Sequence, residues 1–323
     1  MRYFNRVIAA LLAAALLFAA APSRSDAQNA SSLLSTLLSL VLNSAPPALP
    51  QYYQPAVDQP NQIWQPGDWS WGPGGYFWVP GTWVTPPQPG RLWTPGYWAS
   101  NGSGYTWTPG YWAQNVGYYG GINYGNGYYG TGYTGGRWNG NAFDYNTAVT
   151  NVNTTYVRYV YVDRTVLVNR YRGNFISYNG GRGGISARPT SREIQVRRER
   201  HYPMTDLQRQ HFAVAAQNRN YLARVNHGHP AAVSVRKPLS SDNRPSGFTP
   251  IRSTDRIAAP TPHRAMPVRH AAPVVHTHAA PAMHVAPARH AAPAMHGAPA
   301  RHAAPVTHGQ AKPKGNPHPS PHP

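Results

Sequence analysis

Four copies of one aromatic hexapeptide constrain this chain more than any other feature. Each copy has the form Trp-x-Pro-Gly-x-Trp, so that a Pro-Gly step lies between two Trp. The four frames are Trp64–Trp69, Trp78–Trp83, Trp93–Trp98 and Trp107–Trp112, and their starts lie 14, 15 and 14 residues apart. A short and nearly fixed period of this kind indicates one supersecondary unit that is stacked on itself.

Turn residues stand both inside and between these frames. Within a frame, proline fixes φ at about −65° and the glycine after it can adopt positive φ, so Pro-Gly predicts a turn with the two Trp opposite each other across it. Further turn signals lie between the frames, at residues 72–75, 86–90 and 101–104. The pattern therefore predicts a meander of about seven short strands. Because an L-Pro-Gly turn splays a tight hairpin, we expect bulged or open connections.

The Trp residues of the frames have two interpretations that the sequence leaves open. They can form the core, because a domain of such short strands has little else to bury. Alternatively, flat aromatic faces beside polar residues can stack on sugar rings. The candidate aromatic binding surface then consists of Trp64, Trp69, Trp78, Trp83, Trp93, Trp98, Trp107 and Trp112. A nucleic-acid platform needs interleaved basic residues, and only Arg91 lies within residues 64–112, so we expect no nucleic-acid partner.

The frames fit the pattern Trp-x-x-Gly-x-Trp, and the segment therefore resembles the WxxGxW (YXWGXW) repeat family of exported bacterial proteins. Three downstream segments are also similar to those that accompany such repeats, namely Ile176–Ile185, Ala187–Thr190 and Val225–Gly228. The resemblance implies a β-rich repeat and a location in a Gram-negative cell envelope. It implies no activity.

The N-terminus has the features of an export signal. Arg2 and Arg6 precede an uncharged Ala/Leu-rich run over residues 7–21, and small residues at Ser25 and Ala27 fit a cleavage site before Gln28. The apolar run falls short of the roughly 20 residues that a membrane span needs. We therefore expect a signal peptide over residues 1–27 and a mature protein in the periplasm, the cell envelope or the extracellular space.

Residues 28–60 predict a short helix followed by a Pro-rich linker. Leu33, Leu34 and Leu37 fall at helical spacing. Without Lys or Arg on its polar face, the helix is expected to be a packing helix or a flexible leader, and not a membrane-surface or partner-docking helix. The repeat region follows over residues 61–116. Residues 117–140 contain ten Gly and six Tyr, which predicts a low-complexity insertion, either mobile or self-adhesive through Tyr.

Residues 141–239 predict a small basic α+β region. Strands are expected over residues 152–168 and 175–178, and helices are expected to begin at Thr190 and Thr205, which have capping residues in register. Residues 151–239 contain 15 Lys+Arg and 4 Asp+Glu, a net charge of +11. This excess indicates attraction to polyanions. Outside the cytoplasm these are anionic polysaccharide, lipopolysaccharide or an acidic membrane surface.

Residues 240–323 predict a disordered Pro/Ala/His-rich tail. Six His recur every six residues from His278 to His308, which places them on one face of a polyproline II helix, roughly 19 Å apart. One metal ion cannot bind two His at that spacing unless the chain folds back. The sequence therefore assigns no metal ligand and no cofactor, although metal handling by the tail stays an alternative function.

Catalytic motifs are not apparent in the sequence, which also contains no Cys. Asp163, Glu193, His201 and His211 are the acids and bases that could in principle form a site, but their spacing gives no reason to group them. The fold class is therefore predicted as mainly β: a Trp-Pro-Gly hairpin repeat, a small basic α+β region and a C-terminal tail. The predicted function is a non-catalytic, exported envelope protein that binds anionic envelope polymers or surfaces. A metal-handling protein and an enzyme are the alternatives.

Overall fold

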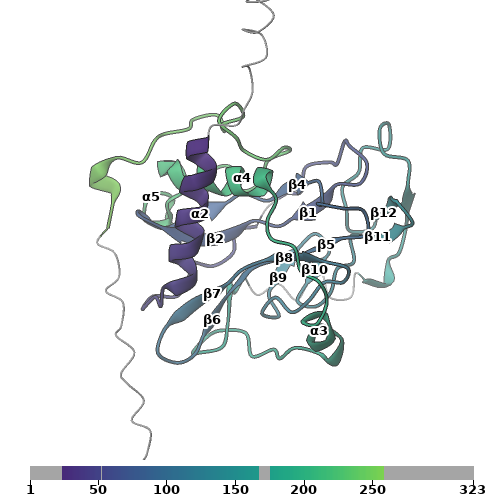
Figure 1. The fold of residues 1–323 in the computed structure, drawn as a ribbon, viewed down its shortest axis with the longest axis horizontal. Coiled ribbons are helices and arrows are strands. Elements are labelled where there is room, and N and C mark those ends of the chain that lie inside the picture. The colour runs from purple at the N-terminus through teal and green to yellow at the C-terminus, as the bar shows by residue number, and fades with distance from the viewer. Residues whose placement is uncertain (1–23, 52, 167–174, 258–323) are drawn as a thin grey trace, which may run out of the picture. The chain divides into compact units, whose positions relative to one another are not determined.

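The chain folds mainly into short strand pairs, with a few helices packed against them (Figure 1). This fold is that of a computed structural model, which describes residues 24–51, 53–166 and 175–257. The described residues all belong to one compact unit. Most of the predicted signal peptide and most of the predicted tail lie outside them, and the predictions for those segments stay predictions.

The four frames form two hairpins, each made of two neighbouring frames. The first hairpin contains β1 (Ile63–Gln65), β2 (Asp68–Gly72), β3 (Gly75–Val79) and β4 (Thr82–Val84). The second hairpin contains β5 (Leu92–Thr94), β6 (Tyr97–Ser100), β7 (Tyr105–Thr108) and β8 (Tyr111–Ala113). In both, the two outer strands pair with each other and the two inner strands pair with each other, all antiparallel.

The Pro-Gly steps interrupt strands and do not reverse the chain, which corrects the turn predicted within each frame. Trp64 pairs with Trp83 and Trp69 with Trp78, so each frame faces its neighbour. The chain reverses between frames, at residues 73–74 and 101–104. The four frame glycines, all within the described residues, lack positive φ. Because proline cannot donate to a strand ladder, the ladder stops at each Pro-Gly and resumes beyond it.

The Gly/Tyr-rich residues 117–140 are packed, which corrects the expectation of a mobile insertion. They form β9 (Asn123–Gly125), β10 (Tyr128–Tyr129) and β11 (Gly136–Asn139). Tyr124 and Tyr128 are buried, and their hydroxyls donate to the carbonyls of Gly96 at 2.6 Å and Trp93 at 2.8 Å. This segment packs on the repeat, so its composition alone does not indicate its order.

The strand predicted from residue 152 to a turn at Asp163 is largely wrong, and residues 167–168 beyond that turn lie outside the described residues. Strand β11 pairs with β12 (Ala142–Asn146), and β13 (Val160–Tyr161) joins β12 in parallel. The backbone turns after Asn153, whose carbonyl accepts hydrogen bonds from two amides further along the chain. The strand predicted over residues 175–178 is reduced to β14 (Tyr178–Asn179), which lies beside β6.

The helices follow the predicted caps. Helix α2 (Arg24–Ser39) begins before the predicted start at residue 28 and packs against α4 (Asp206–Gln217) and the repeat strands (Figure 1). Helices α3 (Ser191–Val196) and α4 begin at Thr190 and Thr205 with complete capping boxes. The short helices η2 (Arg219–Tyr221) and α5 (Ala223–Asn226) follow. Within the described residues, no helix has the length and apolar character that a membrane crossing requires.

Residues 240–257 are folded, so the predicted tail boundary at residue 240 is too early. The Ile251 amide donates to the Gln217 carbonyl at 2.9 Å, and the Ile257 amide donates to the Pro73 carbonyl at 2.7 Å. The short helix η3 (Ser253–Asp255) ends at a buried carboxylate that accepts from Arg219 at 3.1 Å. These contacts attach the segment to α4 and to the first hairpin.

Candidate functional site

The Trp residues of facing frames meet in edge-to-face or tilted pairs. The first hairpin contains Trp64–Trp83 and Trp69–Trp78, with ring centroids 5.1 and 5.2 Å apart. The second hairpin contains Trp93–Trp112 and Trp98–Trp107, at 5.2 and 5.4 Å. These distances lie in the range of favourable aromatic pairs. The first Trp of a frame therefore always contacts the second Trp of its neighbour.

The frame glycines explain the rest of the motif. A Cβ on Gly67 would lie 2.3 Å from the Trp78 ring and 2.9 Å from the Gly81 amide nitrogen. A Cβ on Gly96 would lie 2.4 Å from the Trp107 ring and 2.9 Å from the Gly110 amide nitrogen. Gly81 and Gly110 have the reciprocal contacts with Trp64 and Trp93. Glycine is thus required because an indole ring and a second backbone approach it closely.

Seven of the eight frame Trp belong to the core, which corrects the candidate aromatic binding surface. The buried rings are those of Trp64, Trp69, Trp78, Trp83, Trp93, Trp98 and Trp112, none more than 4% exposed. A ring inside the core cannot present its face to a sugar. Trp107 is the exception, because it is half-buried and lines two hollows of the surface.

An apolar groove of about 470 Å³ opens beside Trp107. We call it the Trp107 groove, and its walls include Leu34, Leu38, Trp107, Tyr111, Tyr202 and Met204. Leu38 is 53% exposed although it is a large apolar side chain. The ring of Tyr111 stacks on His201 with centroids 3.9 Å apart. The groove therefore presents apolar and aromatic surface to solvent between α2 and the segment that precedes α4.

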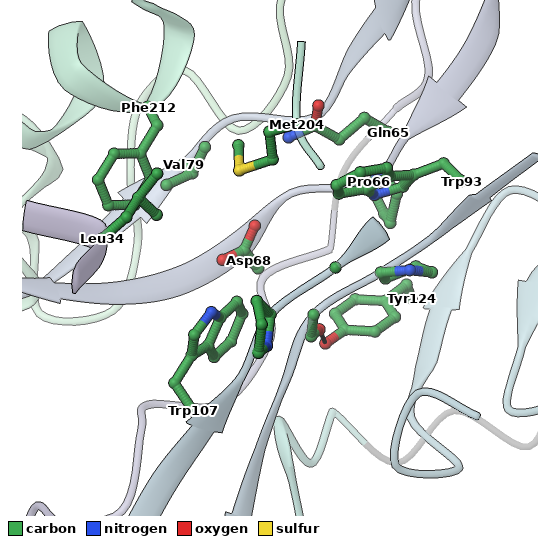
Figure 2. Close-up of a pocket in the computed structure, with 14 residues that line it drawn as sticks. Leu34, Gln65, Pro66, Asp68, Val79, Trp93, Trp107, Tyr124, Met204 and Phe212 are labelled. Atoms are coloured by element: carbon green, nitrogen blue, oxygen red, sulfur yellow. Dashed lines mark hydrogen bonds between the residues drawn. The ribbon is translucent and has the colours of Figure 1, made fainter. Parts of the chain in front are cut away.

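A smaller hollow of about 40 Å³ adjoins this groove. We call it the Asp68 cavity, since Asp68 points into the ring of residues around it, with Trp107 on one side and Met204 on the other (Figure 2). Trp93, Pro66 and Tyr124 also line it. Trp107 and Met204 line both hollows. The volume has room for roughly two to three water molecules.

The Asp68 carboxylate is unusual because it is half-buried beside apolar and aromatic walls. Among the described residues, no hydrogen bond or ion pair to this carboxylate is present. Desolvation by the apolar walls raises the pKa of Asp68 to about 7. A carboxyl group of this kind is ready to accept a cation or to hold a proton at neutral pH.

A second candidate site is a basic surface around α3. We define the α3 basic surface by five exposed arginines: Arg188, Arg192, Arg197, Arg198 and Arg200. The two acids between them point inward. Glu193 is 3% exposed and accepts from the Thr190 amide at 2.8 Å, and Glu199 accepts from Asn115 Nδ2 at 2.7 Å. The outward face of this segment is therefore almost purely cationic.

A polar hollow of about 280 Å³ lies next to the α3 basic surface. Asn115, Thr131, Thr190 and Arg192 are among the residues that line it. Hydroxyl and amide groups can each donate and accept hydrogen bonds. The Arg192 guanidinium lines the hollow, and so does the Glu193 carboxylate, which accepts from Thr131 Oγ1 at 3.1 Å and from Thr190 Oγ1 at 2.9 Å.

The acids and bases considered for catalysis are not brought together. Glu193 serves the α3 cap, Asp163 accepts from Thr165 at 2.9 Å, and His201 Nε2 lies 2.9 Å from the Val196 carbonyl. His211 is buried in α4, where its Nε2 lies 2.8 Å from the Pro80 carbonyl. Among the described residues, no hydrogen bond or ion pair joins any two of these four side chains, so the arrangement forms no acid–base pair.

Sequence reasoning missed two polar residues that matter, Gln208 and Asp68. Gln208, which caps α4, is fully buried and accepts from Trp112 Nε1 at 2.7 Å while donating to Gln65 at 2.9 Å. It thereby joins both hairpins to α4. Asp68 had a visible signal, because it is the only acidic residue within the four frames.

Comparison with known proteins supports the repeat assignment. A family model described as a WXXGXW repeat of two copies matches residues 60–84, 89–113 and 102–119. The resemblance predicted from the Trp frames is therefore confirmed for this part of the chain, and the matched residues all lie before residue 120. No curated protein and no solved structure matches the chain significantly.

Proposed function

We propose that this chain is a non-catalytic, exported protein of the cell envelope that binds an anionic polymer through the α3 basic surface. In this proposal the Trp-Pro-Gly hairpins form the scaffold, and the basic α+β region of residues 141–239 supplies the contact. The repeat family that the frames match points to the envelope. The proposal assigns no reaction to the protein.

The observation that carries the proposal is the separation of charge around α3. Five arginines face solvent within 13 residues, and the two glutamates between them are used in internal hydrogen bonds. The glutamates therefore do not neutralise the arginines by ion pairs, and the exposed face of the segment carries positive charge only. Such a face concentrates anions near it and attracts polyanions over about a Debye length, roughly 8 Å at physiological salt.

A polysaccharide suits this surface better than a flat membrane does. The adjoining hollow is lined by Asn115, Thr131 and Thr190, whose amide and hydroxyl oxygens can accept hydrogen bonds from the hydroxyls of a sugar. Its volume of about 280 Å³ lies just below the range of about 300–1,000 Å³ that is typical of ligand pockets. We therefore place an acidic polysaccharide first, with the phosphate groups of lipopolysaccharide or an anionic membrane as the other outcomes of the test.

The test compares two double variants of equal charge. Arg197→Glu with Arg198→Glu alters the α3 basic surface, while Arg182→Glu with Arg256→Glu changes two exposed arginines elsewhere by the same total charge. The first variant should bind a polygalacturonate column at least tenfold more weakly than the parent protein, because each basic residue near an anionic surface contributes about 1 kcal/mol. The second should lose about threefold or less.

Three results decide the proposal. Equal loss in both variants would reduce it to non-specific attraction by the net charge. Retention on phosphatidylglycerol vesicles, but not on polygalacturonate, would assign the surface to membranes. Binding that does not weaken between 0.05 and about 0.5 M salt would contradict an electrostatic site. Fractionation of a tagged copy tests the envelope location, with the mature N-terminus expected at Gln28.

The metal-handling alternative depends mainly on His residues beyond residue 257. Those residues lie outside the described part of the chain, and the alternative stays a prediction. Within the described residues, no group of three or more His, Asp or Glu side chains is arranged to hold a metal ion.

A further inference from the structure

A half-buried carboxylate lies in a small cavity beside an apolar groove. Asp68 lines the small cavity, and Trp107 and Met204 line both this cavity and the larger Trp107 groove. Because the two hollows share these walls, a ligand that lies in the groove can extend one end into the cavity. The combination specifies the chemistry of both ends of that ligand.

We propose that the Asp68 cavity and the Trp107 groove together bind an organic cation with one ammonium head and an apolar stem. The head lies against the Asp68 carboxylate, between the aromatic walls of the cavity. The stem lies in the groove against Leu34, Leu38 and Tyr202. This site adjoins the α3 basic surface, because the Arg200 guanidinium lies over the Tyr202 ring, 5.1 Å from its centroid, and it takes a ligand of the opposite charge.

The cavity favours an ammonium head over other cations. A carboxylate in apolar surroundings gains most from a ligand that brings a positive charge and hydrogen-bond donors to it. The rings of Trp93, Trp107 and Tyr124 line the same space, and aromatic faces attract ammonium groups. Calcium would need about six to eight oxygen ligands, whereas Asp68 is the only carboxylate that lines this cavity. The volume of about 40 Å³ excludes a sugar ring.

The walls of the groove indicate the chemistry of the ligand's stem. Its walls are mostly apolar, with Leu34, Leu38, Pro109 and Met204 beside the aromatic rings. A hydrocarbon stem that displaces water from these walls should raise the affinity about three- to fourfold for each CH₂ group that it buries. The sugar-stacking interpretation of the frame Trp therefore does not suit this groove, although Trp107 lines it.

Other charged groups near the groove already have partners. Arg209 lines the groove, and its guanidinium donates to the Met204 carbonyl and pairs with the Asp206 carboxylate. Arg91 and Arg200 lie over the Tyr202 ring, 5.2 and 5.1 Å from its centroid. His201 lines the groove and stacks on Tyr111. Every comparison between pH values therefore includes a variant of Asp68 that keeps these other groups.

The experiment uses the mature full chain and titrates it with methylammonium, butylammonium and hexylammonium, with hexanol as the uncharged control. Binding is followed by calorimetry and by Trp fluorescence at pH 8. We expect the affinity to rise along the amine series, and hexylammonium to bind at least tenfold more tightly than hexanol. Asp68→Asn should abolish that preference, whereas the exposed-site control Asp242→Asn should keep it. Circular dichroism of each variant checks that it is folded.

Two further measurements test the two ends separately. Leu38→Gln, at a side chain that is 53% exposed, should weaken the binding of hexylammonium at least threefold and leave the binding of methylammonium unchanged.

The pKa of Asp68, raised to about 7 by desolvation, makes the carboxylate largely charged at pH 8 and largely neutral at pH 6. The affinity for hexylammonium should therefore fall about tenfold between these pH values in the parent protein, and clearly less in Asp68→Asn.

Several results would overturn the proposal. They are equal binding of hexanol and hexylammonium, undiminished binding by Asp68→Asn, or an unchanged pH response in that variant. A blocked lysine, acetyl-lysine methylamide, distinguishes the source of the ammonium group. If it binds as tightly as butylammonium, the natural ligand is a lysine side chain of a protein partner. If only the free amines bind, the ligand is a soluble amine. None of these amine-binding measurements depends on the outcome of the polygalacturonate test on the α3 basic surface.

Discussion

The two hairpins have the same interior and different exteriors. In both, facing frames place Trp pairs 5.1–5.4 Å apart and bring two glycines against the indole rings of the partner frame. The first hairpin is covered: Trp78 Nε1 donates to the Val233 carbonyl at 3.0 Å, and the Pro80 carbonyl lies 2.8 Å from His211. In the second hairpin, the equivalent Trp107 and Pro109 line an open groove.

This difference separates what the motif determines from what its surroundings determine. The hexapeptide determines the Trp pair and the glycine contact, because both are internal to a pair of frames. Whether a frame Trp becomes core or surface depends on segments more than a hundred residues away, such as residues 233–239 over the first hairpin. A repeat of this kind can thus gain a binding site wherever one of its frames is left without a cover.

The sharpest test of the comparison removes equivalent rings from the two hairpins. Trp78→Ala should lower the free energy of unfolding by about 3–5 kcal/mol, because it empties a fully buried site. Trp107→Ala should lower it by only about 1–2 kcal/mol, because the ring is half-buried. Urea unfolding followed by far-UV circular dichroism measures both. Equal losses would mean that the second hairpin is as well covered as the first, and the comparison would fail.

The cover over the first hairpin should also give the protein a specific sensitivity to acid. The Leu239 amide donates to His211 Nδ1 at 2.8 Å, so the ring is neutral with its proton on Nε2, directed to the Pro80 carbonyl. Burial lowers the pKa of His211 to about 4. Between that value and the unfolded value of about 6.5, the unfolded state binds the proton and the native state does not, so stability falls as the pH is lowered.

The expected size of this effect is about 3 kcal/mol between pH 7 and pH 4. His211→Gln has no such proton to bind, so its unfolding free energy should change less over the same range. His201→Gln is the matched control, because His201 is exposed. Unfolding midpoints at pH 4, 5, 6 and 7 measure the difference. Parallel pH curves for the parent and His211→Gln would show that the ring does not hold the cover in its neutral form.

The sequence predicted the parts of this fold that depend on local chemistry. The capping residues Thr190 and Thr205 begin helices as expected, and the turn signals at residues 72–75 and 101–104 reverse the chain. The pairing of frames could not be predicted in this way. Pro-Gly is compatible with a turn and with a strand break, and the choice depends on whether the glycine faces another backbone.

The candidate site was less predictable than the fold. Trp107 was one of eight candidate rings, and nothing in its own frame distinguishes it from the buried Trp93, whose frame has the same sequence. The groove exists because α2 and the segment before α4 stop short of covering this ring, and the sequence does not contain that information locally. Asp68 could have been singled out, since the equivalent positions of the other frames hold Thr82, Tyr97 and Tyr111. The ordered packing of residues 117–140 was missed because the ten glycines suggested a flexible backbone, whereas the tyrosines of the segment pack on the repeat.

The smallest expected effect is a change of stability with pH at the fifth position of a frame, which is Asp68 in the first hairpin and Tyr111 in the second. The native state holds a proton on Asp68 up to a pKa of about 7, whereas the unfolded state releases it near 3.8. Stability should therefore decrease as the pH rises from about 4 to about 7, which is the opposite of the His211 effect.

Asp68→Asn removes this loss without changing the size of the side chain. We expect the variant to match the parent protein at pH 4 and to exceed its unfolding free energy by about 2 kcal/mol at pH 8, less than the full shift implies because Asp68 is partly exposed. Tyr111→Phe, at the equivalent position of the fourth frame, should show no such dependence on pH. If Asp68→Asn is instead less stable than the parent at pH 8, the carboxylate has a favourable partner in the free protein. The open side of the second hairpin would then not lie beside a carboxylate that is free to bind a cation.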